Sequence, residues 1–155
     1  MSTRGAAGIR MNGIDKVGYN HFDSYPSGLG VDILHWLSKT NKEELISFFN
    51  EIVFDDKNDV WDDNNRKMNK SFQEDSAFLV DSLFCEYAYI VNLDENVLEF
   101  YVGFNKDPNA KGRYAKLSDP IVIDESRRYY GVALKKTFPL DECFKGKYTS
   151  KDFED

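Results

Sequence analysis

Alternation of polar residues with small or apolar ones predicts a β-hairpin at the start of the chain. Two strands, residues 4–11 and 14–22, flank Asn12-Gly13, a dipeptide that tolerates the positive φ angles of a two-residue type I′ turn. Glycine and alanine fill positions 5–8, and position 18 is also glycine, which leaves little side-chain bulk on this ribbon. We therefore expect another segment to pack closely over the hairpin.

The turn also predicts which residues of the hairpin lie opposite one another, because Met11 then faces Ile14. The pairs that follow are Arg10 with Asp15, Ala6 with Tyr19, Arg4 with His21, and Ser2 with Asp23. Directly opposed residues share one face of a sheet, and so do alternate residues of one strand. The polar members of the last three pairs should therefore gather at one end of the hairpin.

A helical period replaces the alternation after a turn at Pro26. Apolar residues recur with helical spacing from Leu29 to Lys39, and Thr40-Asn-Lys-Glu43 matches a capping box that predicts a second helix directly afterwards. We expect these two helices to lie on one face of the sheet. Ser71-Phe-Gln-Glu74 is another capping-box match, and it predicts a third helix that ends near Leu83.

Strand-like patterns dominate the rest of the chain. Residues 87–93 and 97–104 flank a short polar turn, and further strands are predicted at 113–117, 121–123 and 127–136. The acidic stretch 55–70 is predicted to be an exposed, flexible loop, and 145–155 a charged tail. The order of elements predicts an α+β fold for residues 1–155 as a single domain: a mainly antiparallel sheet with an N-terminal β-hairpin and about three helices packed on it.

Length and cysteine usage narrow the class of protein. A chain of 155 residues fits one domain, and Cys85 and Cys143 lie far apart without metal-ligand spacing. We expect reduced thiols and a cytoplasmic location. The first eight residues lack the apolar run of a secretory signal, and no apolar stretch of about 18 residues is present, so we expect no membrane association.

Charge is unevenly distributed along the chain. The totals are 20 Lys and Arg against 27 Asp and Glu, a net charge of −7, yet residues 105–151 hold more basic than acidic side chains. Arg113 and Arg127 lie among the aromatic residues of this basic part, where they can bind an anionic ligand or neutralise the acidic part of the same fold. The overall acidity makes nonspecific binding to duplex nucleic acid unexpected.

The polar end of the hairpin carries the chemistry that stands out most. A carboxylate such as Asp23 can orient an imidazole, the imidazole of His21 can act as a general base, and the Arg4 guanidinium can hold an anion. The candidate catalytic residues are therefore His21, Asp23 and Ser2. The alternative is structural: His21 and Asp23 only fix the Pro26 turn.

A more specific catalytic role for Ser2 is that of an N-terminal nucleophile. If Met1 is removed, the free α-amine of Ser2 can serve as base for its own hydroxyl, as in N-terminal nucleophile hydrolases. The sequence shows no alternation of strands and helices that would build the layered fold of those enzymes.

Metal and cofactor motifs are absent from the sequence. The acidic run that begins at Asp55 lacks the spacing and the central glycine of an EF-hand, and the histidines and cysteines show no local zinc spacing. No phosphate-binding loop, GxGxxG or GxSxG motif occurs. We expect no metal and no cofactor.

Two segments resemble a family of small, mostly uncharacterised bacterial and bacteriophage proteins. The chain opens M-x-T-R and carries Tyr19-x-His21-x-Asp23-Ser24-Tyr25-Pro26, which is similar to that family's Y-x-H-x-D-[GS]-Y-P segment, with serine where glycine is commoner. The resemblance covers about the first 40 residues well and implies a phage or mobile-element setting, without an established reaction. It marks Thr3, Arg4, His21, Asp23, Tyr25 and Pro26 as residues of interest.

Two hypotheses of function follow. The first is a noncatalytic phage or bacterial accessory protein that binds a partner protein or a small anionic, nucleotide-like ligand, with modulation of host defence as a conceivable role. Its ligand-binding candidates are Thr3, Arg4, Tyr19, His21, Asp23, Tyr25, Arg113 and Arg127, and a homo-oligomer is left open. The alternative is a small hydrolase or transferase that uses His21 and Asp23 with Arg4 or Ser2, so the sequence leaves open whether the protein is an enzyme.

Overall fold

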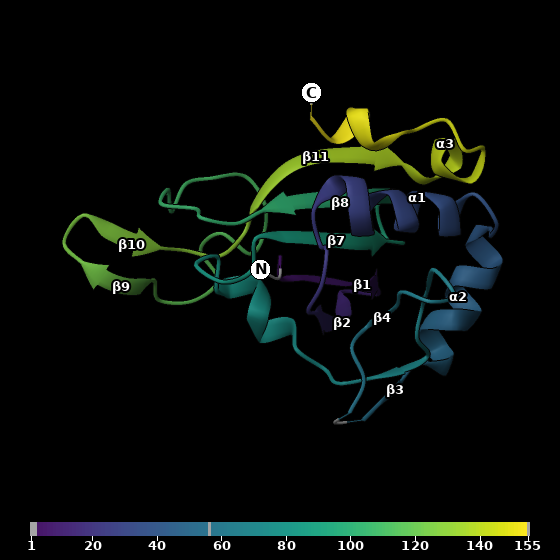
Figure 1. Ribbon diagram of the computed structural model, residues 1–155, viewed down its shortest axis with the longest axis horizontal. Helices are drawn as coiled ribbons and strands as arrows, with labels where there is room; N and C mark the ends of the chain where they lie inside the picture. The colour runs from purple at the N-terminus through teal and green to yellow at the C-terminus, as the bar shows by residue number, and fades with distance from the viewer. Residues whose placement is uncertain (1–2, 56, 155) are drawn as a thin grey trace.

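A five-stranded sheet forms the centre of the computed structural model, which describes residues 3–55 and 57–154 (Figure 1). The strand order is β11-β8-β7-β1-β2, with bounds Gly5–Met11 for β1, Ile14–Asn20 for β2, Tyr87–Asn92 for β7, Val97–Val102 for β8 and Ala133–Pro139 for β11. β1 and β7 run parallel, and the other three neighbouring pairs run antiparallel. The predicted α+β class with an N-terminal β-hairpin is confirmed.

The hairpin has the predicted turn and register. Asn12 and Gly13 have φ angles of 54° and 73°, Arg10 lies opposite Asp15, and Ala6 lies opposite Tyr19. The Asp94 carboxylate, from the turn between β7 and β8, accepts the two turn amides at 2.7 and 2.9 Å. A residue from a distant part of the chain therefore caps this turn.

Helices cover one face of the sheet, and α1 crosses in front of β7 and β8 (Figure 1). The elements on this face are the π-helical turn η1 (Pro26–Gly30), α1 (Val31–Leu37), α2 (Lys42–Glu51), α3 (Leu140–Phe144) and the 3₁₀ helix η3 (Ser150–Phe153). α2 begins after Asn41, one residue later than predicted. The Asn41 side chain accepts the Glu44 amide at 2.9 Å, so it takes the capping role expected of Thr40.

The predicted third helix over residues 71–83 is wrong. Ser71–Phe72 forms strand β6, paired with β3 (Val53–Phe54), and only a short 3₁₀ helix, η2 (Ser76–Val80), follows in this segment. Phe72 is fully buried against Gly18, where an added Cβ would lie 2.6 Å from the Phe72 ring. This is the close approach expected over the glycine-rich hairpin, and it holds residues 71–72 extended despite their capping sequence.

Of the later strand predictions, the one over residues 113–117 is wrong, and the one over 127–136 is confirmed only in part. Residues 113–117 form a turn in which Arg113 and Tyr114 both point inward to the sheet, an arrangement that successive residues of a strand cannot adopt. The strand predicted over 127–136 is divided, because Val132 donates its amide to the Leu79 carbonyl at 2.9 Å. Its first part, β10 (Arg127–Tyr129), pairs with β9 (Ile121–Asp124).

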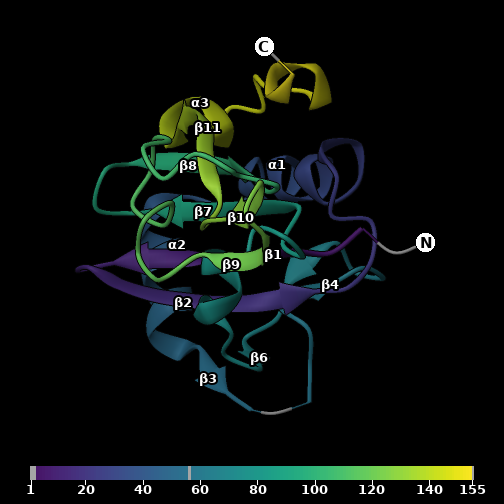
Figure 2. The same cartoon turned by 90° about the vertical axis from the view of Figure 1, so that its left-hand side faces the viewer.

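The β9–β10 hairpin projects from the body of the protein. Figure 1 shows it extending to the left, and Figure 2, viewed from that side, shows it in front of the sheet. Ile123 is 48% exposed, and its neighbour Val122 is 52% exposed. We call this element the arm.

The segments predicted as a loop and a tail both contribute to the core. Residues 55–70 include the short hairpin of β4 (Trp61–Asp62) and β5 (Lys67–Met68), in which Trp61 and Met68 are buried. In the predicted tail, Phe153 is fully buried against Tyr89, Phe100 and Phe138.

Cys85 and Cys143 are both buried and form no disulfide. Among the residues described, no helix is both long and apolar enough to cross a membrane.

Candidate functional site

The predicted end of the hairpin brings Tyr19 and His21 together. Tyr19 Oη and His21 Nδ1 form a hydrogen bond of 2.6 Å, and the Phe78 ring packs edge-on against Tyr19 at 5.2 Å between centroids. Partial burial raises the pKa of Tyr19, and the nearby Arg4 guanidinium acts in the opposite direction. His21 donates its backbone amide to the Asp59 carboxylate at 3.1 Å. Arg4, Tyr19 and His21 are thus neighbours, as the register predicts.

Asp23 and Tyr25 belong to the turn that follows. Asp23 has a φ angle of 54°, and its backbone carbonyl accepts the amide of Leu29 at 2.9 Å. Its carboxylate raises the pKa of the Tyr25 hydroxyl by charge repulsion. The geometry shows a structural role for Asp23 in the Pro26 turn and a side chain directed to Tyr25.

Ser24 anchors the same turn to the sheet. Its side chain is fully buried, and its hydroxyl accepts a hydrogen bond from the side-chain amide of Asn20 at 2.9 Å. Its backbone donates to the Thr3 carbonyl at 3.1 Å and accepts from the Tyr89 hydroxyl at 2.8 Å. Serine at this position therefore supplies a hydrogen bond that glycine cannot. The proposed nucleophile, Ser2, lies outside the residues that the structure describes.

Arg113 and Arg127, the other predicted ligand-binding residues, are each paired with a carboxylate. Arg127 contacts Asp124 at 2.6 Å within the arm, and Arg113 makes two hydrogen bonds to Glu99, of 2.7 and 2.8 Å. Arg113 also lies 3.9 Å from Asp15, which pairs with Arg10 at 2.9 Å. Both predicted anion-binding arginines thus already have an anionic partner.

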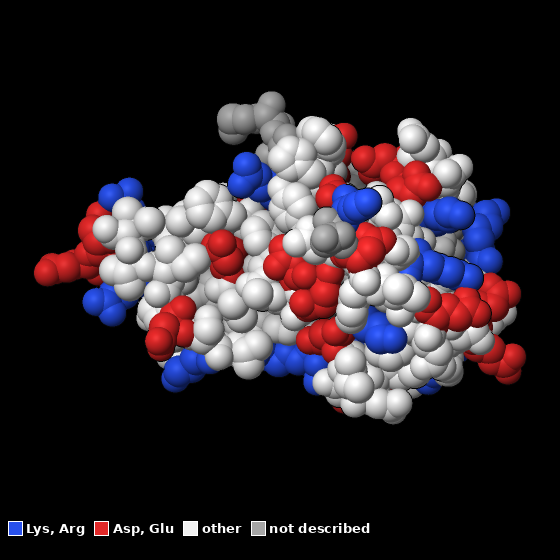
Figure 3. Space-filling model, turned by 90° about the horizontal axis from the view of Figure 1, so that it is seen from below, with Lys and Arg blue, Asp and Glu red and all other residues white. Residues whose placement is uncertain are grey.

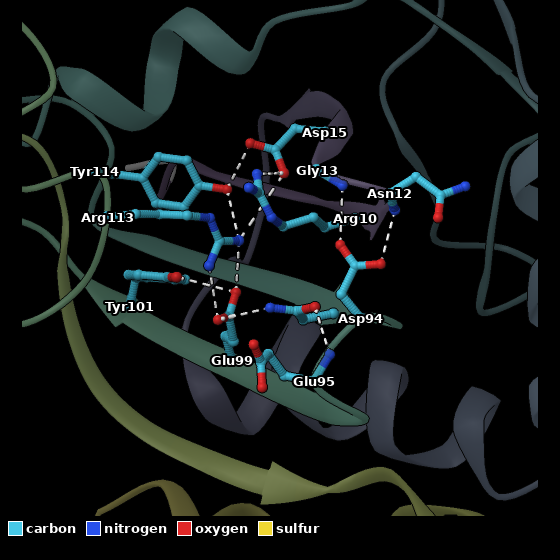
Figure 4. A network of polar contacts seen from close by, with 11 residues as sticks. Arg10, Asn12, Gly13, Asp15, Asp94, Glu95, Glu99, Tyr101, Arg113 and Tyr114 are labelled. Carbon is cyan, nitrogen blue, oxygen red and sulfur yellow. Dashed lines mark hydrogen bonds and ion pairs between the residues drawn. The ribbon is translucent and has the colours of Figure 1, made fainter.

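Figure 4 shows the network that surrounds Arg113. Glu99 accepts hydrogen bonds from the Tyr101 hydroxyl at 3.0 Å and the Asn92 amide at 3.2 Å as well as from Arg113, and its side chain is only 7% exposed. The Tyr114 hydroxyl donates to Asp15 at 2.8 Å. Burial, followed by the neighbouring carboxylates, raises the pKa values of Tyr101 and Tyr114, so both remain protonated donors.

Around Arg113 the network joins Arg10 and Arg113 to the carboxylates of Asp15 and Glu99, and each oxygen of these two carboxylates has a partner (Figure 4). Its geometry fits a structural role, a clamp that holds the 105–117 segment on the sheet, because each arginine in it is paired with a carboxylate of the same network. The sequence pattern indicated Arg10 opposite Asp15. It did not indicate Glu99, whose only signal is a charged residue inside an apolar strand.

The predicted ligand-binding residues do not form one site. Arg4 precedes the start of β1, whereas the Arg113 network surrounds Arg10, near the end of that strand. Six residues of extended strand separate the two places by about 20 Å. A small ligand cannot contact both.

Four exposed aromatic residues lie at the Arg4 end of the sheet. Phe22 is 55% exposed, Tyr25 38%, Phe84 50% and Phe104 55%. Phe22 and Tyr25 follow β2, Phe84 precedes β7, and Phe104 follows β8. The strand order therefore places these four residues at the same end of the sheet. We call these four residues the aromatic end.

Backbone contacts confirm that the segments of the aromatic end are neighbours. Ser24 donates to the Thr3 carbonyl, and Glu86 donates to the Arg4 carbonyl at 3.1 Å, while Phe104 donates to the Ser82 carbonyl at 2.6 Å. Because adjacent strands are about 4.8 Å apart, the row from β2 to β8 spans about 14 Å. The aromatic end is wide enough to contact several side chains of another molecule.

Three surface grooves lie elsewhere. The first, of about 550 Å³, is bordered by α1, α2 and Lys70. The second, of about 370 Å³, lies between α1 and the C-terminal segment near His35 and Tyr148. The third, of about 430 Å³, lies between the start of α2 and α3. None of the three is lined by Arg4, His21 or Asp23. Within residues 3–55 and 57–154, no three His, Cys, Asp or Glu side chains are placed to hold a metal ion.

A scan of protein-family models and searches of curated proteins and solved structures give no match to this chain. The family resemblance of the N-terminal segment therefore stays a prediction.

Proposed function

We propose that this chain is a noncatalytic binding protein that docks a partner protein against the aromatic end. The observation that carries the proposal is the row of four exposed aromatic side chains along one end of the sheet. Scattered exposed apolar residues are ordinary, but a contiguous group of large ones marks an interaction surface. Aromatic side chains also dominate the binding energy of many protein interfaces.

The backbone at Phe104 supports this assignment. Its φ angle is 53°, a conformation that is uncommon for a bulky residue, and its side chain is 55% exposed. A strained backbone that presents an apolar ring to water does not serve the core. Such strain is often found where a protein makes a functional contact.

The arm extends from the same end of the molecule (Figures 1 and 2). It exposes Val122 and Ile123, and Leu117 in the segment before it is 66% exposed. An isolated two-stranded hairpin is at most marginally stable in water. Packing of these aliphatic side chains against a partner would order the arm and enlarge the interface.

A small anionic ligand has less support than a protein partner, because Glu99 and Asp124 already neutralise Arg113 and Arg127. The strand aromatics Tyr89, Phe100 and Tyr101 are buried, so they offer no surface for stacking bases. The enzymatic alternative rests on the hydrogen bond between Tyr19 and His21. In the phage or bacterial setting that the resemblance implies, the proposed partner is a host or phage protein, with host-defence proteins among the candidates.

Site-specific photocrosslinking in cells of the natural host tests this function. A benzophenone amino acid at position 104 should give one discrete crosslinked species, whereas the same group at Val53, exposed on β3, should give none. Excess wild-type protein should suppress the crosslink, and an excess of the Phe84→Ser/Phe104→Ser variant should not. Equal crosslinking at both positions, or equal suppression by both competitors, would refute docking at the aromatic end. A crosslinked dimer of this chain would identify the partner as a second copy.

A further inference from the structure

The groove between α1 and α2 has two aromatic walls. It has a volume of about 550 Å³, and its aromatic lining residues are Trp36 and Phe48. Their rings are 5.6 Å apart at an angle of 71°, and the buried Trp61 ring packs edge-on with Trp36 at 5.7 Å and 90°. Trp36 therefore contacts two other rings while it still borders the groove. The face of an indole or phenyl ring attracts cations.

Carboxylates line the same groove. Glu44, Phe48 and Glu51 recur at helical spacing on α2, so they share one face of that helix. The Thr40 hydroxyl donates to Glu44 at 2.9 Å, which fixes that carboxylate at the rim. Glu43 is a further acidic lining residue. The groove is lined by three carboxylates and by two lysines, Lys39 and Lys70, so its lining has a net negative charge.

The protein's own Lys70 already occupies this environment. Its Nζ atom lies 5.8 Å from the centre of the Phe48 ring and 2.6 Å from Glu51 Oε2. Both side chains of the ion pair are more than half exposed. An exposed pair of this kind adds little to stability, so another ammonium group can replace Lys70 at low cost.

We propose that this groove binds a lysine side chain of a partner polypeptide, with the ammonium group between Glu51 and Phe48 in place of Lys70. The negative charge and the aromatic walls select a cation, and Lys70 shows that an alkylammonium group fits. The groove is also larger than an ammonium group, so the residues on either side of the lysine lie within it. This site is separate from the aromatic end, and its test does not depend on the proposed function.

Fluorescence titration with a synthetic peptide tests the site. The probe is Ac-Gly-Ala-Lys-Ala-Gly-NH₂, and the matched control carries norleucine, which keeps the alkyl chain without the charge. The chain has two tryptophans, of which Trp61 is buried and Trp36 borders the groove. The lysine peptide should therefore change the Trp36 emission saturably, and Trp36→Phe should abolish that change. Binding of the norleucine peptide with equal affinity would refute the proposal.

Two variants separate binding in the groove from nonspecific attraction. Lys70→Met removes the competing ammonium group, so affinity for the lysine peptide should rise about two- to fivefold, the range expected for an exposed cation–π contact. Glu51→Gln should lower it by a similar factor. An unchanged or lower affinity of Lys70→Met, with its circular dichroism spectrum intact, would overturn the assignment. Equal affinity for methylammonium chloride would overturn the part of the proposal that assigns the site to a polypeptide.

Discussion

Replacement of Glu99 by alanine should destabilise the fold far more than the loss of a surface ion pair. Glu99 accepts two of the hydrogen bonds that Arg113 donates, and it also accepts one from the Tyr101 hydroxyl (Figure 4). The Arg113 guanidinium cannot lose its proton in response, since arginine remains charged in proteins. The Glu99→Ala variant therefore leaves a half-buried positive charge and a buried hydroxyl without their main acceptor.

The size of the effect follows from the exposure of the two partners. Removal of one partner of a buried ion pair costs about 3–5 kcal/mol. The side chain of Glu99 is 7% exposed, but that of Arg113 is 28% exposed, and Arg113 keeps its hydrogen bond to Tyr114 and its proximity to Asp15. We therefore expect the low end of that range, about 3 kcal/mol. For a chain of this length the melting temperature should fall by about 6–12 °C.

Urea unfolding, followed by circular dichroism, measures this loss. The control is Asp124→Ala, which breaks the exposed pair with Arg127 in the arm and should have no measurable effect. The double variant Glu99→Ala/Arg113→Met should recover part of the stability, because it removes the uncompensated charge. If Glu99→Ala lowers the unfolding free energy by less than about 1 kcal/mol, the Arg113–Glu99 pair behaves as a surface ion pair. That result would refute the assignment that this network holds the 105–117 segment on the sheet.

Three further changes should have defined effects. The Asp94 carboxylate accepts hydrogen bonds from the Gly13 and Asn12 backbone amides, and these lower the pKa of Asp94 below the ordinary 3.8. The ionised carboxylate therefore stabilises the folded state above pH 3.8, and this contribution is lost as the pH falls through the lowered pKa of the folded state. Asp94→Asn should accordingly flatten the acid side of the unfolding free energy measured against pH in urea. Partial burial and then nearby carboxylates, Asp32 first, raise the pKa of Asp63, so its charged form destabilises the fold once the pH exceeds the ordinary pKa. Asp63→Asn should raise the melting temperature at pH 7, and the gain should shrink near pH 4 and in high salt; a lower melting temperature at pH 7 would contradict this assignment. Phe153→Ala should cost about 3–5 kcal/mol in urea unfolding, whereas an unchanged stability would show that η3 does not belong to the core.

The parts of the fold that depend on neighbouring residues could be predicted from the sequence. The Asn12-Gly13 turn determines its own geometry and therefore the hairpin register, including Arg10 opposite Asp15. The helices over 31–37 and 42–51 have continuous apolar stripes that give each of them a buried face. In these segments the local preference and the tertiary contacts agree.

The prediction failed where distant contacts decide the conformation. The capping sequence at Ser71 favours a helix, but burial of Phe72 over Gly18 and pairing with β3 keep the segment extended. Similarly, residues 113–117 are predicted as a strand, yet Arg113 and Tyr114 turn inward to Glu99 and Asp15. Asp15 and Tyr114 are 99 positions apart, and no local pattern can indicate such a contact.

The candidate site was predicted in part for the same reason. The strand pattern placed Arg4, Tyr19 and His21 together, because they belong to one hairpin. The aromatic end combines Phe22, Phe84 and Phe104 from three separate strand ends. Its recognition requires the strand order, in particular the parallel pairing of β1 with β7, which the sequence did not show.

The charge distribution acquires a different meaning once the chain is folded. Arg113, from the basic part of the sequence, pairs with Glu99 and approaches Asp15 from the acidic part, so some of the positive charge is used within the molecule. Seen from below, the acidic side chains gather near the middle of the face, while lysine and arginine are more scattered (Figure 3). Since the whole chain has a net charge of −7, a basic partner would be attracted over a long range, whereas an acidic one would be repelled. Association with a basic partner should therefore slow as salt is added, and association with an acidic partner should become faster; a rate independent of salt would show that contacts at the aromatic end act without electrostatic steering.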